Sequence, residues 1–346
     1  MPDQSKRSER VGKAAGRFLQ YGTTWTLTTE VEELIPTCEP VCEACGAHNH
    51  SEIGRKRGWV VRRCATCGLF FVWPQPKWDE LREVYSSKTG YYSTAETNLA
   101  TAPTSAAVVL DETLRRAGVV EGRLLDVGCS NGQLIYGMRR LGWNAMGLDV
   151  NAHVLGIARR NGLGVVFGNL EGVPFRGASF DAINMGDVLE HVRSPRMCLR
   201  TANRLLRPGG VVVINTPNAE CGFARSTLHL ANTLHFPWPQ SEAPYHLYEF
   251  NRHSLGRLLM EVGFTVEAIS CHGRKGFAYT VGASGYFDEL KMRLKRKGKY
   301  QFDWSLLGTF PALILMVGLL LPFHVYGLVS DWVNGTGCNL TVVARV

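Results

Sequence analysis

The sequence predicts an α/β fold in which a sheet of mostly parallel strands follows a small cysteine-rich module. From residue 106 to residue 270, short apolar runs alternate with segments of helical period, which is the pattern of strands joined by crossover helices. Before them stand two C-x-x-C pairs, each followed by glycine and separated by eighteen residues. After them, a long apolar stretch precedes one last strand-like run. We therefore expect a cysteine-rich module, an α/β core and a C-terminal insertion into that core.

The α/β core is arranged around a strand, a tight turn and a helix. An apolar run at 124–127 carries Asp126, residues 128–132 (Gly-Cys-Ser-Asn-Gly) form the turn, and residues 133–141 show helical spacing. Glycines let a ligand approach the backbone closely, and the start of a helix offers unpaired N–H groups. A second strand ends in Asp149, where nucleotide-binding folds hold ribose hydroxyls. We therefore expect a nucleotide-type cofactor at this turn.

Two protein families share such a turn. Read as G-x-S-x-G, residues 128–132 would be the nucleophile elbow of an α/β-hydrolase. Read as D-x-G-x-(small)-x-G, residues 126–132 resemble motif I of class I S-adenosylmethionine (AdoMet) methyltransferases. Asp126 and Asp149 favour the second interpretation, and no H-G-G-G segment precedes the turn. The resemblance implies a Rossmann-like, seven-stranded sheet with AdoMet as its cofactor.

The same resemblance assigns the cofactor contacts to residues at the ends of successive strands. After the third strand the family usually places an acid that reaches the adenine amine. Here the residue is Asn169, whose side-chain oxygen still accepts a hydrogen bond. The expected cofactor-binding residues are Asp126, Gly128, Cys129, Ser130, Gly132, Asp149, Val150, Asn169, Leu170, Gly186 and Asp187.

The two cysteine pairs predict a structural zinc site. Four thiolates at this spacing form a tetrahedral Zn²⁺ site of the zinc-ribbon kind, with no position open for catalysis. Its expected ligands are Cys42, Cys45, Cys64 and Cys67. The module C-x-x-C-G…C-x-x-C-G-L-x-F-x-x-P ahead of the core resembles a bacterial group of small-molecule methyltransferases. That group acts on sugars, polyketide-type products and cell-surface glycans.

The end of the fourth strand holds the first catalytic candidates. Asp187, Glu190 and His191 follow a strand that begins at Phe180, and active sites of open parallel sheets lie beyond the carboxyl ends of strands. Residues 188–192 (V-L-E-H-V) resemble a signature of the ubiquinone-biosynthesis O-methyltransferases. In some of those enzymes, acids and the histidine of this motif hold a divalent metal. Two other interpretations stay open: His191 as general base, or Glu190 and His191 as braces for the helix start.

The remaining elements complete the sheet. We expect helices at 106–117, 154–160, 197–206 and 254–263, strands at 211–214, 264–269 and 337–345, and an R-P-G-G turn at 207–210. Residues 219–245 read as a loop-rich lid. His246 lies in an H-x-x-x-F segment that borders the acceptor pocket in related enzymes, so it is a second catalytic candidate; the alternative is a packed loop histidine. The expected domains are a flexible segment (1–36), the ribbon (37–76), a helical linker (77–118) and the methyltransferase domain (119–346), with insertions at 219–245 and 285–335.

The C-terminal insertion suggests a membrane surface. Residues 291–299 carry six basic side chains, and 306–329 contain no charged residue. Pro311 and Pro322 break the run, and a core strand follows it, so we expect contact with the membrane through 291–331 without a crossing. A buried helix pair or a dimer interface is the alternative.

The chain has 346 residues and a formal net charge of +8, which suits an anionic partner. Residues 1–17 lack the apolar run of a secretory signal, so we expect a cytoplasmic protein, peripheral to the inner face of the membrane. We expect AdoMet-dependent methyl transfer to a small or lipid-linked acceptor: a glycan, quinone or secondary-metabolite intermediate. The alternatives are an RNA methyltransferase and a catalytically inactive membrane scaffold. The densest basic cluster lies away from the ribbon, so nucleic acid is not an expected partner; an oligomer is left open.

Overall fold

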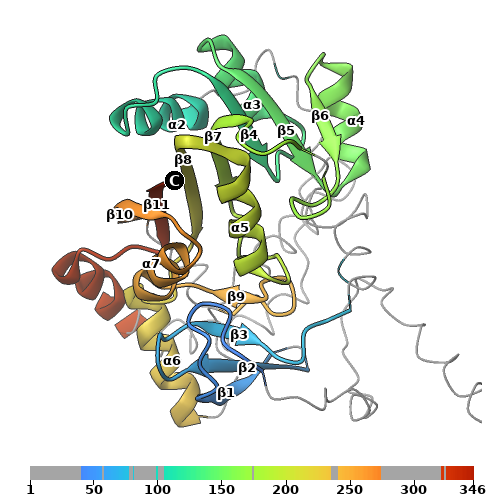
Figure 1. Ribbon diagram of the computed structural model, residues 1–346. Helices are drawn as coiled ribbons and strands as arrows, with labels where there is room; N and C mark the ends of the chain where they lie inside the picture. The colour runs from blue at the N-terminus through green and yellow to red at the C-terminus, as the bar shows by residue number, and fades with distance from the viewer. Residues whose placement is uncertain are drawn as a thin grey trace, which may run out of the picture. The chain divides into compact units, whose positions relative to one another are not determined.

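Figure 1 shows a computed structural model of the chain. It describes residues 40–346 except 57, 78–80, 82–98, 100–104, 174, 235–240, 274–320 and 323–324. Within it, residues 36–346 belong to one compact unit.

The central sheet has seven strands in the order β10-β11-β8-β7-β4-β5-β6. The strands are β4 (Arg123–Val127), β5 (Asn144–Asp149), β6 (Val165–Phe167), β7 (Phe180–Gly186), β8 (Leu206–Pro217), β10 (Thr265–His272) and β11 (Asn339–Arg345). The pairs β4–β5, β5–β6, β4–β7 and β7–β8 are parallel, and β11 is antiparallel to both β8 and β10. The seven-stranded fold expected from the sequence is confirmed, including the return of the last strand into the sheet.

Helices cover both faces of this sheet. They are α2 (Ser105–Arg116), α3 (Gln133–Arg140), α4 (Ala152–Arg160), α5 (Pro195–Leu205) and α7 (Arg252–Glu261). Successive strand residues point to opposite faces: Leu124 and Ala182 pack in one core cluster with α2, α3 and α4, whereas Leu125 and Ile183 pack in the other with α5 and α7. The carboxyl ends of the parallel strands are therefore left as one shared edge between two helical layers.

The cysteine-rich module forms a second sheet. Its strands are β1 (His50–Lys56), β2 (Trp59–Cys64) and β3 (Phe70–Val72), and β9 (Tyr248–Glu249) from the methyltransferase part pairs with β3. Phe70 and Phe71 face Glu249 and Tyr248 across this pair. The ribbon is thus joined to the larger part by backbone pairing as well as by side chains.

The structure corrects two expectations between β8 and β9. The R-P-G-G segment is not a separate turn, because β8 starts at Leu206 and runs through it to Pro217, with an irregular register against β7. Residues 222–234 are not loop-rich: they form helix α6 (Gly222–Leu234). Its first residues are buried against the ribbon, with Phe223 and Ala224 in one cluster with Val61. Apolar packing against that partner therefore makes a helix where the sequence suggested loops.

Most of the basic and apolar stretch expected at the membrane lies outside the described residues. Residues 325–334, which include the last residues of this stretch, are helical. Asp331 Oδ1 accepts hydrogen bonds from Gly222 N and Thr336 Oγ1, each 2.6 Å long, and so ties this helix to the start of α6. Among the residues described, no helix has the length and apolar character needed to cross a bilayer.

Candidate active site

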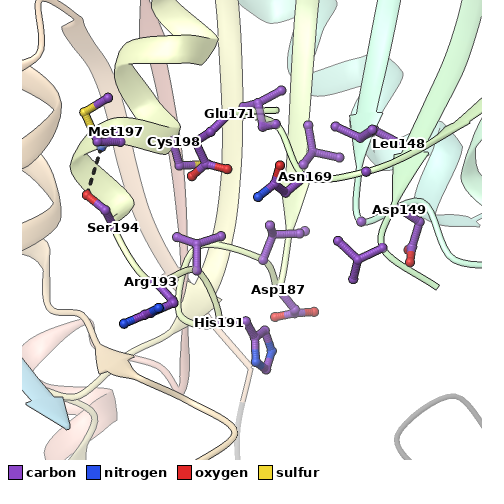
Figure 2. A pocket seen from close by; sticks show the side chains of 18 of the residues that line it. Leu148, Asp149, Asn169, Glu171, Asp187, His191, Arg193, Ser194, Met197 and Cys198 are labelled. Carbon is purple, nitrogen blue, oxygen red and sulfur yellow. Dashed lines mark hydrogen bonds between the residues drawn. The ribbon is translucent and has the colours of Figure 1, made fainter. Parts of the chain in front are cut away.

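A cavity of about 740 Å³ opens at the carboxyl ends of β4, β5, β6 and β7 (Figure 2). This is the edge at which open parallel sheets bind ligands. Its described lining is Val127, Gly128, Ser130, Leu148, Asp149, Val150, Gly168, Asn169, Leu170, Glu171, Gly186, Asp187, Val188, His191, Val192, Arg193, Ser194, Met197 and Cys198. Eight of the eleven expected cofactor-binding residues are in this set.

The turn after β4 is shaped by a glycine and held by an acid. Gly128 has φ +74°, and a Cβ there would lie 2.5 Å from Val188 Cγ2. Asp149 Oδ2 accepts a hydrogen bond from Ser130 N, and Oδ1 accepts one from Asn151 N, both 2.8 Å long. Asp149 thereby links the ends of β4 and β5 at the wall of the cavity, and burial raises the pKa of its carboxyl group.

Three expected cofactor residues lie behind the cavity wall rather than on it. Asp126 is 3% exposed and accepts a 2.8 Å hydrogen bond from Asn184 Nδ2. Burial, with Asp149 nearby, raises its pKa to about 7. The side chain of Cys129 packs in the core, where a Cβ on Gly147 would lie 2.4 Å from its sulfur. Gly132 starts α3 at φ 86°, with Leu163 against it. These three residues support the turn from the side of the core instead of lining the cavity.

The remaining wall comes from the start of α5, which the sequence analysis missed. Ser194 caps α5 by accepting a hydrogen bond from Met197 N, and Pro195 is its first residue. Figure 2 shows Met197 and Cys198 on the side of the cavity that holds Asn169 and Glu171. A Ser-Pro pair is a recognised signal for the start of a helix. Had the predicted helix begun at Pro195 instead of Met197, its first turn would have been placed at the cavity.

Of the three catalytic candidates, only His191 lines the cavity. Its Nδ1 lies 2.8 Å from the carbonyl oxygen of Tyr245, and a carbonyl only accepts, so Nδ1 carries the proton and Nε2 is the basic nitrogen of the neutral ring. Burial and the neighbouring His246 lower the pKa of His191 to about 3. His191 is therefore neutral at physiological pH.

Glu190 and His246 lie behind His191. The two histidine rings stand edge to face, 4.8 Å apart. Against the effect of burial, Glu249, at 3.2 Å from His246 Nδ1, raises the pKa of His246 to about 9. Glu190 is 1% exposed and accepts a 3.0 Å hydrogen bond from Thr216 Oγ1, and burial raises its pKa to about 7. The site therefore sets a cationic His246 beside a neutral His191.

The expected divalent-metal motif is only partly assembled. One ligand atom from each of Glu190, His191 and His246 lies within 4.8 Å of the others, whereas Asp187 is not in this group. Glu190 Oε1 is buried without a hydrogen-bond partner among the described residues. A divalent ion here would take these three side chains as ligands only by displacing the proton of His246, and it would then polarise an acceptor oxygen.

The four expected zinc ligands are gathered at one point of the ribbon. The sulfurs of Cys42 and Cys67 are 3.5 Å apart, those of Cys45 and Cys64 are 3.6 Å apart, and all four lie within 4.8 Å. A tetrahedral site with Zn–S bonds of about 2.3 Å needs sulfurs roughly 3.8 Å apart. Against the effect of burial, backbone N–H groups of Cys67 and Thr66 lower the pKa of Cys64 to about 7. The donor set therefore fits Zn²⁺.

Residues 103–269 match a family model described as a methyltransferase domain. Similar curated proteins include the ubiquinone biosynthesis O-methyltransferase of Xanthomonas oryzae pv. oryzae, 36% identical over 118 residues, which are 32% of this chain and 49% of the relative. The enzyme of that name from Pseudomonas aeruginosa is 33% identical over 113 residues, 30% of this chain and 47% of the relative. The chain thus spans about half the length of the curated relatives it matches.

Solved structures with a similar fold are more distant. They include the [4+2]-cyclase SpnF, with a TM-score of 0.44 and 19% identity over 70% of this chain and 80% of that one. A putative sarcosine dimethylglycine methyltransferase from Galdieria sulphuraria has a TM-score of 0.45 and 16% identity over 69% and 84%.

Proposed function

We propose that this chain is a class I AdoMet-dependent methyltransferase that transfers the AdoMet methyl group to an oxygen of a small phenolic or enolic acceptor. Its residues 103–269 match a family model described as a methyltransferase domain. The observation that carries the proposal is the position of His191, a neutral imidazole on the wall of the cavity in which the expected cofactor residues meet. Its basic nitrogen is defined by the contact of Nδ1 with Tyr245. The oxygen acceptor also agrees with the activity named for the relatives.

The ends of the strands would hold the cofactor. Asp149 would hold the ribose hydroxyls, Gly128 would let the backbone approach, and Asn169 and Leu170 would border the adenine. The sulfonium methyl would then face the exits of β7, where His191 and Asp187 lie. Most of the acceleration would come from holding methyl and acceptor in line.

The weakness of the base suggests the class of acceptor. An imidazole with a pKa of about 3 accepts a proton poorly from a sugar hydroxyl, but a phenol with a pKa near 10 loses its proton more easily. AdoMet would supply the methyl group from its sulfonium and be left as a neutral thioether. His191 would take up the phenolic proton at Nε2 as the acceptor oxygen bonds to the methyl carbon.

The test measures release of S-adenosylhomocysteine (AdoHcy) from AdoMet with 3,4-dihydroxybenzoate, methyl glucoside and ethanolamine as acceptor probes. We expect turnover with the catechol alone. Turnover with ethanolamine alone would indicate nitrogen methylation, and turnover with the glucoside would contradict the phenolic class. The variant His191→Gln should lose this turnover, whereas the matched control His153→Gln, at an exposed position of α4, should leave it unchanged.

We propose, as a second feature, that the protein meets a lipid surface through the helix at 325–334. Its exposed apolar residues repeat at helical spacing on one face, with Trp332 77% exposed. They are Val325, Tyr326, Val329, Trp332 and Val333. Tyr and Trp favour membrane interfaces, and the basic run at 291–299 precedes this helix in the sequence.

Cosedimentation with vesicles of phosphatidylcholine and phosphatidylserine tests this feature. The wild-type chain should pellet, and the double variant Val329→Ser/Trp332→Ser should pellet much less. Val109→Ser removes a comparably exposed valine, 64% exposed, from α2 and should pellet like the wild type. Equal pelleting of all three proteins would refute the assignment of this face.

A further inference from the structure

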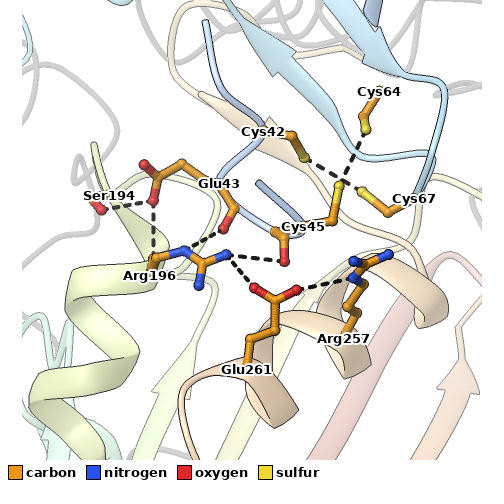
Figure 3. A network of polar contacts seen from close by, with 10 residues as sticks. Cys42, Glu43, Cys45, Cys64, Cys67, Ser194, Arg196, Arg257 and Glu261 are labelled. Carbon is orange, nitrogen blue, oxygen red and sulfur yellow. Dashed lines mark hydrogen bonds and ion pairs between the residues drawn. The ribbon is translucent and has the colours of Figure 1, made fainter. Parts of the chain in front are cut away.

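The first cysteine knuckle of the ribbon, residues 42–45, is hydrogen-bonded to the first turn of α5 (Figure 3). Glu43, between Cys42 and Cys45, accepts at Oε2 a 2.8 Å hydrogen bond from Ser194 Oγ and a 3.4 Å one from Arg196 N. Ser194 Oγ in turn accepts a hydrogen bond from Met197 N. A carboxylate at the start of a helix is stabilised by the unpaired N–H groups and the helix dipole. Glu43 therefore completes the cap of α5 from another part of the chain.

Arg196 also donates hydrogen bonds to the backbone of the same knuckle. Its Nε donates to the carbonyl of Glu43 at 3.0 Å, and its Nη2 donates to the carbonyl of Ala44 at 3.3 Å. The same Nη2 lies 2.7 Å from Glu261 of α7, which also pairs with Arg257 at 3.1 Å. Ala44 is fully buried. The knuckle is thus held to α5 by contacts with both its side chain and its main chain, and Arg196 links this contact to α7.

The turn that Glu43 caps is also a wall of the cavity. Ser194, Met197 and Cys198 line it, and Figure 2 shows Met197 and Cys198 on the side of Asn169 and Glu171. Met197 is 49% exposed, so a ligand seated there would cover an apolar side chain. A shift of this turn would alter the end of the cavity where the adenine is expected.

From these contacts we infer that Glu43 is a positioning residue for the cofactor, and that the metal state of the ribbon is coupled to AdoMet binding through it. The inference rests on the proposed function. With Cys42 and Cys45 both bound to Zn²⁺, the backbone at Glu43 is fixed from both sides, and its carboxylate holds the first turn of α5. Loss of the metal frees the knuckle and with it the cap. Because coupling between two binding sites is reciprocal, a bound cofactor must also hold the metal more firmly.

The first experiment compares Glu43→Ala with the wild-type full chain, both zinc-loaded, by calorimetric titration with AdoHcy. We expect one Zn²⁺ per chain in both proteins and a Kd about three to thirty times higher in the variant, the range for a lost helix cap. The matched control is Glu52→Ala, because Glu52 is a ribbon glutamate whose ion pair is with exposed Arg55; its Kd should not change. A variant that binds AdoHcy as tightly as the wild type would overturn the inference.

The second experiment needs no variant. The zinc affinity of the wild-type protein is measured at equilibrium by competition with a chromophoric chelator, with and without saturating AdoHcy. We expect a higher zinc affinity with AdoHcy, and equal affinities would overturn the coupling even if Glu43→Ala fails to fold. Failure of the cofactor assignment is distinguishable, because the wild-type chain would then give no binding heat with AdoHcy at all. Failure of the phenolic acceptor class is read separately, in the turnover assay, and leaves both experiments valid.

Discussion

Replacing Asp149 by Asn tests the ribose contact with almost no change of shape. In the wild type, both carboxylate oxygens accept backbone N–H groups, from Ser130 and Asn151, at 2.8 Å. An amide has one oxygen and one NH₂ group, so one of these backbone donors would face another donor. A hydrogen bond to a charged group contributes about 1.5–3 kcal/mol. We therefore expect the AdoHcy affinity to fall roughly 10- to 150-fold.

Calorimetry with adenosine and 2′,3′-dideoxyadenosine separates the ribose contact from a general loosening of the turn. The wild type should prefer adenosine, and Asp149→Asn should bind both nucleosides equally. The control is Asp181→Asn. Asp181 lies at the start of β7, the end away from the cavity, and accepts hydrogen bonds from Arg123 N and Arg207. That variant should lose stability but keep the preference. If Asp149→Asn keeps the preference for adenosine, the ribose role is refuted.

Four further predictions follow from the site. Gly128→Ala should lose AdoHcy binding because its Cβ meets Val188 at 2.5 Å, whereas Gly118→Ala, with φ +79° but open space around it, should only lower the melting temperature. Purified protein should carry one Zn²⁺ per chain by metal analysis, and Cys64→Ser should lose it together with stability. Because the pKa of Glu190 is raised from 4.5 to about 7, the folded state binds its proton more tightly than the unfolded state does. The free energy of unfolding should therefore fall by on the order of 3 kcal/mol as pH rises from 4.5 to 7. Denaturant unfolding of Glu190→Gln should show a flatter dependence of this free energy on pH over that window. His191→Gln should lower kcat about 10²- to 10⁴-fold in the catechol assay while the AdoHcy affinity stays within threefold, and an unchanged kcat would exclude His191 as the base.

Local patterns in the sequence were enough to predict the sheet and much of the cavity. Strand ends that carry Asp149 or Gly186 come to one edge whatever the helices do, because parallel strands share their direction. The spacing of the cysteines likewise brings four sulfurs together within one small module. These features depend on neighbours close in the chain.

Features made by distant residues could not be predicted. Helix α6 starts where Phe223 packs on the ribbon. The sequence of residues 219–245 does not itself indicate that the ribbon will cover this segment. Glu43 and Arg196 are 153 positions apart, so the contact between ribbon and cavity wall is visible only in the fold. The likeness of residues 126–132 to a cofactor motif identifies the turn, but Asp126 and Cys129 are both buried behind it. The sulfur of Cys129 packs against Gly147 of β5, a contact that the local pattern does not predict.

The most direct test of the account is photo-crosslinking of the full chain with AdoMet labelled in its methyl group, followed by mapping of the labelled peptides. The account predicts label at the exits of β4, β5 and β7 and in the first turn of α5, all of it displaced by excess AdoHcy. Label confined to other segments, or label that AdoHcy does not displace, would contradict the claim that this cavity binds the methyl donor.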